Sequence, residues 1–332
     1  MLQDITVLIK GAVERNVTGD GDAKMMQFTR RRVLLGGAAV LTLGVAGAGY
    51  GEISGALPGH TSFRQALGLD GPNGTVPAAA TSVSMEREYS SARGVEVNLA
   101  VMSPAGVSRA GLPVVVVLHG RSGSAQQMVQ IGFPQFLTAA VAAGAAPFVL
   151  LAVDGGDDTY WHPVTTAGKR DDPQAMLMNE VPQWMAKYGL GATGTAPQPD
   201  GVIGISMGGF GAFLYAYNRR MVQSASGRPP LSVVAALSPA VFEDWSDAKS
   251  VGAFSSTADW AGSEPLQHVS SLQGQKCAIW CGKDDPFYAA SQLLAKEIPG
   301  SESFFSPGAH TTGYWTRVIP AALQFLGHSG MA

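Results

Sequence analysis

The chain has 332 residues, of which 46% are hydrophobic and only 14% are charged. This composition can bury a large core, and the roughly 250 residues that follow the amino-terminal region fit one large α/β domain. The net charge of −3, with no basic cluster in the body of the chain, argues against nucleic acid as a partner.

A run of charge stands out only near the amino terminus, where Thr29–Leu35 contains three consecutive arginines. An uncharged stretch of Ala, Gly, Leu and Val follows, and the combination resembles a twin-arginine export signal. Residues 46–48 read Ala-Gly-Ala, a candidate cleavage site, whereas retention of residues 33–51 would leave a membrane anchor. We therefore assign residues 1–51 to an extension with a signal or anchor, and expect export through the twin-arginine pathway to the cell envelope or beyond it.

The rest of the chain divides into a Gly-, Pro-, Ala- and Thr-rich linker at residues 52–80 and a domain at residues 81–328. Apolar runs of strand length alternate in this domain with segments of helical periodicity. The expected strands are Ser82–Tyr89, Val95–Met102, Leu112–Leu118, Pro147–Val153, Gly201–Ile205, Ser232–Leu237, Cys277–Cys281 and Glu302–Phe305. The expected helices are Gln126–Ala143, Ala175–Tyr188, a helix that begins after Ser206, Pro286–Glu297 and Thr312–Leu326.

The first two strands surround a turn at residues 92–94 and predict an antiparallel hairpin. The later strands are apolar throughout and alternate with helices, which predicts a mostly parallel, doubly wound sheet with its active site at the carboxyl ends of the strands. The long connection Val241–Val269 contains Trp245, Phe254 and Trp260, and we expect it to form a small cap, with a solvated loop as the alternative.

The most informative motif lies in Asp200–Phe213, where Ser206 stands between Gly204 and Gly208. An apolar strand should turn sharply into a helix here, which is the context of a nucleophile elbow. The turn crowds the positions two residues to either side, so glycine is needed there, and it holds the serine oxygen out at the edge of the sheet. Ser206 is therefore the predicted nucleophile, and the N–H of Met207 is one predicted donor to an oxyanion.

A serine hydroxyl becomes a good nucleophile only when a base takes its proton, and the base needs a carboxylate to fix its tautomer. In this architecture the chain order is Ser, acid, His. The histidines downstream of Ser206 are His268, His310 and His328. His268 lies in the expected cap and His328 in the terminal tail, whereas His310 follows the last strand, so His310 is the predicted base.

Two adjacent carboxylates, Asp284 and Asp285, follow the strand Cys277–Cys281. The Gly-x-x-Asp spacing favours Asp285 as the acid, with Asp284 as the alternative. Asp285 precedes a proline, which is also a normal N-cap position, so it can serve both roles only if its side chain turns away from the helix. The two cysteines of that strand would lie about 13 Å apart, too far for a disulfide, and are expected to be core thiols.

The second oxyanion donor should come from the loop after the strand that ends at Leu118, where the chain reads His-Gly-Arg-Ser-Gly. The N–H of Arg121 is the preferred donor, with Ser122 next. His119 is expected to brace this loop, since no cluster with metal-ligand spacing surrounds it. Trp161, with His119 and Ser122, is a candidate to contact substrate, and ordinary packing under a long loop is the alternative for Trp161.

With Leu118-His119-Gly120, Gly204-Ile205-Ser206-Met207-Gly208-Gly209, Gly282-Lys283-Asp284-Asp285 and Gly308-Ala309-His310 in this order, the chain resembles the esterase D branch of the α/β-hydrolase superfamily. That branch includes S-formylglutathione hydrolases, feruloyl and acetyl-xylan esterases and mycolyltransferases. The resemblance spans roughly residues 82–325 and implies an α/β-hydrolase fold and ester chemistry. A cytosolic S-formylglutathione hydrolase fits poorly with the export signal.

The sequence thus predicts an exported serine esterase that uses Ser206, His310 and Asp285, with no metal or organic cofactor implied. Its expected partner is an ester substrate, with a cell-envelope lipid or glycan ester as one candidate, and membrane association would depend on residues 33–51. One alternative is an acyltransferase that uses the same residues to move an acyl group to a sugar or lipid alcohol. The other is a catalytically silent envelope protein on the same scaffold.

Overall fold

The computed structural model describes residues 70–192, 197–226 and 229–331, all within a unit that spans Gly49–Ala332. The predicted export signal and most of the predicted linker lie outside the described residues. Within the described ranges, no helix combines the length and the hydropathy that a membrane crossing needs.

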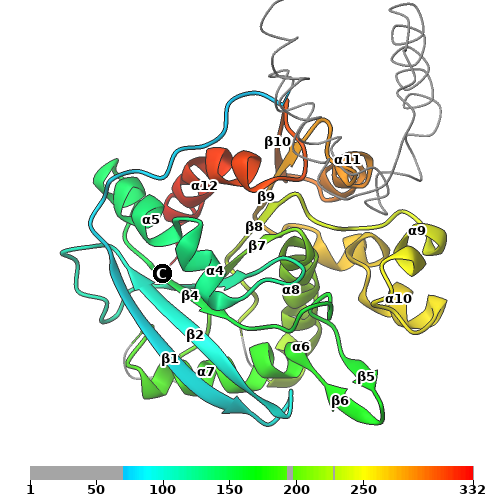
Figure 1. The fold of residues 1–332 in the computed structure, drawn as a ribbon. Helices are drawn as coiled ribbons and strands as arrows, with labels where there is room; N and C mark the ends of the chain where they lie inside the picture. Colours follow the sequence, from blue (N-terminus) through cyan, green and yellow to red (C-terminus); the bar gives the residue numbers. More distant parts are fainter. Residues whose placement is uncertain (1–69, 193–196, 227–228, 332) are drawn as a thin grey trace, which may run out of the picture. The chain divides into compact units, whose positions relative to one another are not determined.

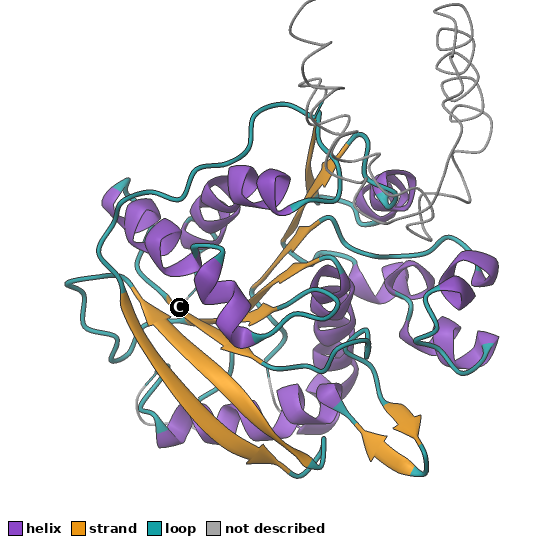
Figure 2. Cartoon of the chain, viewed as in Figure 1, coloured by secondary structure: helices purple, strands orange, loops and turns teal. Residues whose placement is uncertain are grey.

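An eight-stranded sheet with helices on both faces organises the described residues (Figures 1 and 2). The strand order is β1-β2-β4-β3-β7-β8-β9-β10. The β1–β2 and β2–β4 pairings are antiparallel, and every pairing from β4 to β10 is parallel. The strands of this sheet are β1 Ser82–Ser90, β2 Val95–Ser103, β3 Val114–Leu118, β4 Val149–Val153, β7 Gly201–Ile205, β8 Val233–Leu237, β9 Cys277–Gly282 and β10 Glu302–Ser306. The predicted doubly wound sheet with its amino-terminal hairpin is confirmed.

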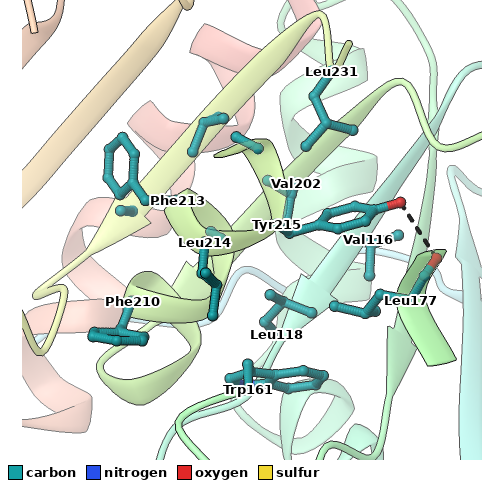
Figure 3. Close-up of a cluster of buried hydrophobic side chains, with 14 of the residues drawn as sticks. Val116, Leu118, Trp161, Leu177, Val202, Phe210, Phe213, Leu214, Tyr215 and Leu231 are labelled. Atoms are coloured by element: carbon teal, nitrogen blue, oxygen red, sulfur yellow. Dashed lines mark hydrogen bonds between the residues drawn. The ribbon is translucent and has the colours of Figure 1, made fainter. Parts of the chain in front are cut away.

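Helices cover the two faces of the sheet in two sets. The helices are α4 Ala125–Gln130, α5 Phe133–Ala142, α6 Pro173–Ala175, a π-helix η2 Met176–Glu180, α7 Val181–Lys187, α8 Met207–Ser226, α9 Trp245–Ser250, α10 Thr257–Ser263, a 3₁₀-helix η3 Pro265–Leu272, α11 Tyr288–Glu297 and α12 Thr312–Gly327. On one face, α4, α5 and α12 pack in one buried apolar cluster. On the other, α8 and η2 pack in a second cluster, where the Tyr215 hydroxyl donates to the Leu177 carbonyl (Figure 3).

The helix expected over Gln126–Ala143 is two helices, α4 and α5. Gly132 separates them with a φ of 102°, a left-handed conformation that glycine adopts without a steric penalty. Pro134 lies in the first turn of α5, where its missing N–H leaves no hydrogen bond unmade. The predicted single helix is therefore wrong at this one glycine.

The helix expected over Ala175–Tyr188 contains a π-helical segment, η2, between α6 and α7. The N–H of Val181 donates to the Met176 carbonyl five residues earlier. Pro182 follows directly and has no N–H for the carbonyl four residues before it, so an uninterrupted α-helical ladder cannot run through this point. The π turn brings Pro182 into the first turn of α7, where proline is tolerated.

A second, two-stranded sheet was not predicted from the sequence. β5 (Val164–Thr166) and β6 (Lys169–Asp171) form an antiparallel hairpin. Ala167 and Gly168 connect them with φ values of 51° and 76°. Two successive positive φ values define the tight turn that suits hairpins, but alanine is an unusual residue for it, so the sequence carries little signal.

The expected cap segment forms α9, α10 and η3. Glu264 precedes η3 and has no exposed surface. Its carboxylate accepts from the N–H groups of Phe242 and Leu266 and from Nε1 of Trp260, at 3.1, 3.2 and 3.1 Å. One buried carboxylate thus joins the loop after β8 to the cap.

Residues 70–77, which we call the strap, cross the amino-terminal end of α12 before the chain enters β1 (Figure 1). The N–H of Gly74 donates to the Gly313 carbonyl at 2.8 Å. Arg317 donates to the carbonyls of Asp70 and Pro72 at 3.0 and 2.9 Å, and to that of Pro307. The part of the predicted linker that the structure describes is therefore packed against the domain at these residues.

Candidate active site

Ser206 occupies the sharp turn between β7 and α8. Its φ of 56° is left-handed, which costs a non-glycine residue roughly 1–2 kcal/mol. Hydrogen bonds hold the turn on both sides: the Ser206 N–H donates to the Leu237 carbonyl at 2.9 Å, and the Ser206 carbonyl accepts from the Gly209 N–H at 2.8 Å. The neighbouring strand β8 and helix α8 thus fix the backbone that projects the hydroxyl.

The two glycines of the motif are needed because other backbone atoms fill the space of a side chain. A Cβ at Gly204 would lie 1.9 Å from the Gly208 carbonyl oxygen, and one at Gly208 would lie 2.0 Å from the Leu118 carbonyl oxygen. No backbone adjustment of a few tenths of an ångström can relieve such overlaps. The Gly-x-Ser-x-Gly spacing is therefore a packing requirement of the turn.

The structure brings Ser206, His310 and Asp285 together at the carboxyl edge of the sheet. Nε2 of His310 lies 2.8 Å from Oγ of Ser206, and Nδ1 of His310 lies 2.9 Å from Oδ2 of Asp285. A carboxylate next to Nδ1 keeps the proton there, so Nε2 is left as the acceptor for the serine hydroxyl. These contacts give the arrangement in which a histidine can remove the proton of a serine.

Asp285 uses its two carboxylate oxygens for different partners. Oδ1 accepts from the Phe287 N–H at 3.0 Å and thereby shapes the turn before α11, while Oδ2 faces His310. Burial by itself raises the pKa of the Asp285 carboxyl, but the charge of His310 and hydrogen bonds from His310 and Ser238 hold it below its usual value. Asp284 is exposed and donates its N–H to the Gly308 carbonyl, so the geometry singles out Asp285 as the partner of His310.

The loop after β3 lies beside the nucleophile. A Cβ at Gly120 would be 3.4 Å from Cβ of Ser206. The N–H of Ser122 donates to the Asp157 carbonyl at 2.8 Å and is already engaged. The N–H of Arg121 has no such partner among the described residues, and its guanidinium pairs with Asp158 away from the backbone.

Met207 follows Ser206 directly in the chain, and its N–H is the other predicted donor. As the first residue of α8, it belongs to the turn whose N–H groups have no carbonyl partner within the helix. The N–H groups of Met207 and Arg121, which the sequence predicts as oxyanion donors, therefore have no backbone carbonyl partner among the described residues.

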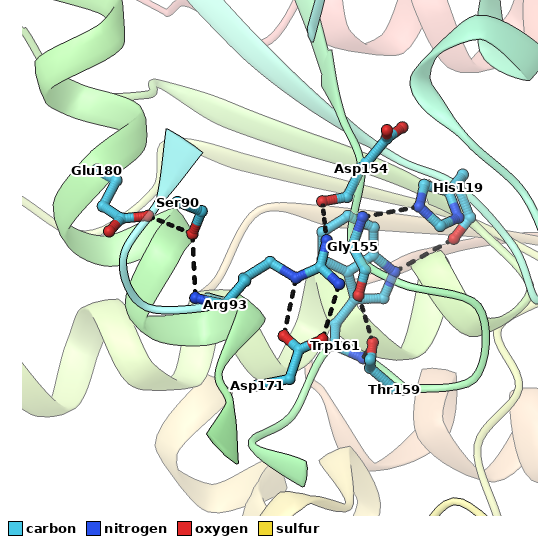
Figure 4. Close-up of polar contacts among 9 residues, drawn as sticks. All are labelled: Ser90, Arg93, His119, Asp154, Gly155, Thr159, Trp161, Asp171 and Glu180. Carbon is cyan, nitrogen blue, oxygen red and sulfur yellow. Dashed lines mark hydrogen bonds and ion pairs between the residues drawn. The ribbon is translucent and has the colours of Figure 1, made fainter. Parts of the chain in front are cut away.

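His119 has no exposed surface and spans the base of the loop (Figure 4). Its Nδ1 donates to the Gly120 carbonyl and its Nε2 accepts from the Gly155 N–H, both at 2.8 Å. Burial lowers the pKa of this imidazole and favours the neutral form, which has the one donor and one acceptor that these contacts use. His119 therefore braces the loop, as predicted from the sequence, and both of its ring nitrogens are engaged by backbone groups.

Trp161 is also fully buried, and its Nε1 donates to the His119 carbonyl at 3.2 Å (Figure 4). A Cβ at Gly155 or at Gly211 would lie 2.4 Å from the indole. The ring fills the space between these two backbones, so the expectation that Trp161 lines the substrate pocket is not met in this structure. Of the three candidate substrate contacts, only Ser122 is exposed.

The support that the β1–β2 turn provides to this loop was not predicted from the sequence. Arg93, at that turn, donates from Nη1 to the Asp154 carbonyl at 2.8 Å and binds both carboxylate oxygens of Asp171 at 2.8 Å (Figure 4). Asp154 directly precedes Gly155, the partner of His119. An arginine in the predicted turn was a weak signal in the sequence, because its partner Asp171 is 78 residues away in the chain.

Two half-buried aromatic rings approach His310 from different elements. The rings of Phe287 and Trp315 lie 5.3 and 5.0 Å from the imidazole, centre to centre, both nearly edge to face.

A separate pocket of about 490 Å³ lies farther along α8, with Leu214, Asn218 and Ser263 among its lining residues. None of the lining residues of that pocket belongs to the Ser206, His310 and Asp285 group.

Comparison with known proteins agrees with this architecture. The putative esterase family model matches residues 90–326. Among solved structures, a ferulic acid esterase has a TM-score of 0.60 and 17% identity, covering 76% of this chain and 100% of its own. An S-formylglutathione hydrolase from Agrobacterium tumefaciens has a TM-score of 0.59 and 15% identity, covering 77% and 98%.

A fluorophosphonate-binding serine hydrolase from Staphylococcus aureus has a TM-score of 0.56 and 17% identity, covering 75% of this chain and 100% of its own. At these identities the likeness supports the fold, which is that of the α/β-hydrolases. A search of curated proteins found no match in sequence. Because the family model spans most of the chain, the chain belongs to the esterase family, and the protein is a carboxylic ester hydrolase.

Proposed function

We propose that the protein is an exported serine esterase in which Ser206 is the nucleophile, His310 the general base and Asp285 the residue that orients His310. The observation that carries the proposal is the continuous pair of contacts from Ser206 Oγ to His310 Nε2, 2.8 Å, and from His310 Nδ1 to Asp285 Oδ2, 2.9 Å. A serine already within hydrogen-bond distance of a correctly oriented imidazole is the arrangement that acyl transfer needs.

In the proposed reaction, His310 takes the Ser206 proton as Oγ attacks the ester carbonyl. The N–H groups of Arg121 and Met207 then stabilise the negative oxygen of the tetrahedral intermediate. His310 returns the proton to the leaving alcohol, which leaves an acyl-serine. Water, activated by the same imidazole, releases the acid and restores Ser206.

The half-buried rings of Phe287 and Trp315 beside His310 favour an ester with an apolar or aromatic group near the reacting carbonyl. A ferulic acid esterase is among the similar structures, and an aromatic acyl group suits these rings. Esters of cell-envelope lipids or glycans belong to the proposed substrates because the proposed location is outside the cytoplasm.

Export is proposed from the sequence of residues 29–51, which lie outside the described residues. Both cysteines are buried free thiols, so the domain needs no oxidising compartment in order to fold. This suits a pathway that transports folded proteins. Replacing Arg30 and Arg31 by lysine should stop export of a reporter fused after residue 60, whereas export without a twin-arginine pathway would contradict the assignment.

A fluorophosphonate probe tests the nucleophile. The purified protein should be labelled, and Ser206→Ala should abolish labelling with an unchanged circular dichroism spectrum. Ser108→Ala is the matched control, because that exposed serine lies in the loop before β3, at the opposite end of this strand from the loop that follows Leu118, and should not affect labelling. Labelling of Ser206→Ala would refute the assignment. Product analysis with p-nitrophenyl esters, with and without a sugar acceptor, then separates hydrolysis from acyl transfer.

A further inference from the structure

The pocket of about 490 Å³ beside α8 is separate from the group of Ser206, His310 and Asp285. Its walls are α8, the segment formed by α6 and η2, and the end of α10 (Figure 1). The volume is in the range of small-molecule sites. Leu214 is the lining residue of α8 that is nearest to the nucleophile in the chain, and at about 1.5 Å per residue it lies about 12 Å from Ser206 along the helix axis.

Gln174, on the α6 wall, carries a buried donor without a partner. The residue is 5% exposed, and its Oε1 accepts from Nδ2 of Asn218, on α8, at 3.0 Å. Its Nε2 is buried and has no hydrogen-bond partner among the described residues. A buried amide N–H without an acceptor is unfavourable, and folded proteins rarely retain one. Because Gln174 and Asn218 both line the pocket, a ligand with an acceptor oxygen would complete this amide pair.

The polar groups of the pocket come from all three walls. Asp172 lies beside Gln174 on the first wall, Asn218 is on α8, and Ser263 is the last residue of α10. Asp172 is the one ionisable residue among the lining residues, and Arg170 pairs with its carboxylate at 2.8 Å. The pocket thus combines amide, hydroxyl and carboxylate groups, which together donate and accept, and its one charge is already paired. This set favours a neutral ligand with several hydroxyl groups.

Apolar side chains form the rest of the pocket. Leu214 and Met178 are buried, whereas Met221 is 56% exposed. Methionine side chains are flexible and adapt to the shape of a ligand. Met178 belongs to the π-helical segment η2, and such segments occur frequently at functional sites. Polar groups in three directions beside an apolar surface match a sugar ring, which carries hydroxyl groups around its edge and C–H groups on its faces.

We propose that this pocket binds one sugar unit of a neutral glycan, with one ligand hydroxyl accepting from Nε2 of Gln174 and another donating to the carboxylate of Asp172. The site does not use the catalytic residues, so the proposal goes beyond the proposed function. A glycan held there lies along the helix whose first residue follows Ser206, which keeps an ester on the same glycan near the nucleophile. Esters without a sugar do not use the pocket.

The test measures binding of xylobiose, cellobiose and maltose to the purified protein by saturation-transfer NMR and by titration. We expect at least one of them to bind. Gln174→Met removes the donor at similar volume and should raise Kd about 5-fold, as expected for one hydrogen bond. Gln174→Met combined with Asn218→Leu should raise Kd about 25-fold. Because both partners then become apolar, this double variant should unfold at a similar temperature.

Gln273→Met is the matched control, because it makes the same substitution at an exposed glutamine outside the pocket, and it should leave Kd unchanged. All these variants should hydrolyse p-nitrophenyl acetate at the normal rate. Ser206→Ala should keep sugar binding whether or not Ser206 is the nucleophile, which separates this test from that of the proposed function.

Two results would overturn the proposal. One is that none of the three saccharides binds. The other is an unchanged Kd in the folded double variant, since the sugar would then lie elsewhere on the protein. If circular dichroism shows that the double variant is unfolded, Gln174→Met alone decides, and an unchanged Kd in that variant overturns the proposal equally.

Discussion

Replacing Asp285 by asparagine changes one group at the centre of the site while keeping its size. In the native structure Oδ1 accepts from the Phe287 N–H at 3.0 Å and Oδ2 faces Nδ1 of His310 at 2.9 Å. If the amide oxygen of the variant stays with Phe287, the amide NH₂ faces Nδ1, which must then become an acceptor. The imidazole proton moves to Nε2, and Nε2 can no longer accept from Ser206.

The opposite amide orientation restores the productive tautomer but sets an NH₂ group against the Phe287 N–H. A buried donor without an acceptor costs about 1–3 kcal/mol, so this orientation is the minor one. The productive fraction is small, and the base has also lost its negative partner. We expect a loss on the order of 10⁴ in kcat, which corresponds to about 5.5 kcal/mol of transition-state stabilisation.

The assay is steady-state hydrolysis of p-nitrophenyl acetate, with circular dichroism to show that the variant is folded. Asp284→Asn is the matched control, because that exposed residue contributes its backbone N–H to the Gly308 carbonyl and should keep activity within a few-fold. A large loss in Asp284→Asn together with a mild one in Asp285→Asn would reverse the two roles. Mild losses in both would show that neither carboxylate orients His310 in catalysis.

Two further predictions concern the framework of the site. Gly208→Ala should prevent stable folding or lower the free energy of unfolding in urea by more than about 3 kcal/mol, because its Cβ would lie 2.0 Å from the Leu118 carbonyl oxygen. Gly262→Ala is the control: this glycine has open space around it, and the substitution should be nearly neutral. Burial raises the pKa of Glu264 from 4.5 to about 8. Between these pH values the folded state binds more protons than the unfolded state, so the free energy of unfolding should fall by a few kcal/mol as pH rises across this window. Glu264→Gln should flatten that decline, and an unchanged slope between pH 5 and 8 would show that another group causes it.

The residues that the sequence identified are those whose signals are local. Ser206 is marked by two glycines that its own turn requires, and Asp285 and His310 follow expected strands at short spacings. Parallel strands deliver such residues to one edge of the sheet, so the meeting of the three could be inferred without a structure.

The residues that the sequence missed act through partners that are distant in the chain. Arg93 is 78 residues from Asp171, and no spacing rule connects them. Trp161 was uncertain for a related reason, since its burial depends on the absence of side chains at Gly155 and Gly211. The break at Gly132 was visible in principle, because Pro134 favours a helix start, but the apolar periodicity ran through both.

The strap limits how far the chain can be shortened from its amino-terminal side without loss of contacts to α12. Arg317 bridges the carbonyls of Asp70 and Pro72 to that of Pro307, three residues before His310. Removal of residues 1–49 would leave this bridge whole, whereas removal of residues up to Pro72 would leave Arg317 without its two carbonyl partners in the strap. A truncated enzyme designed for crystallisation or display therefore has to begin before Asp70.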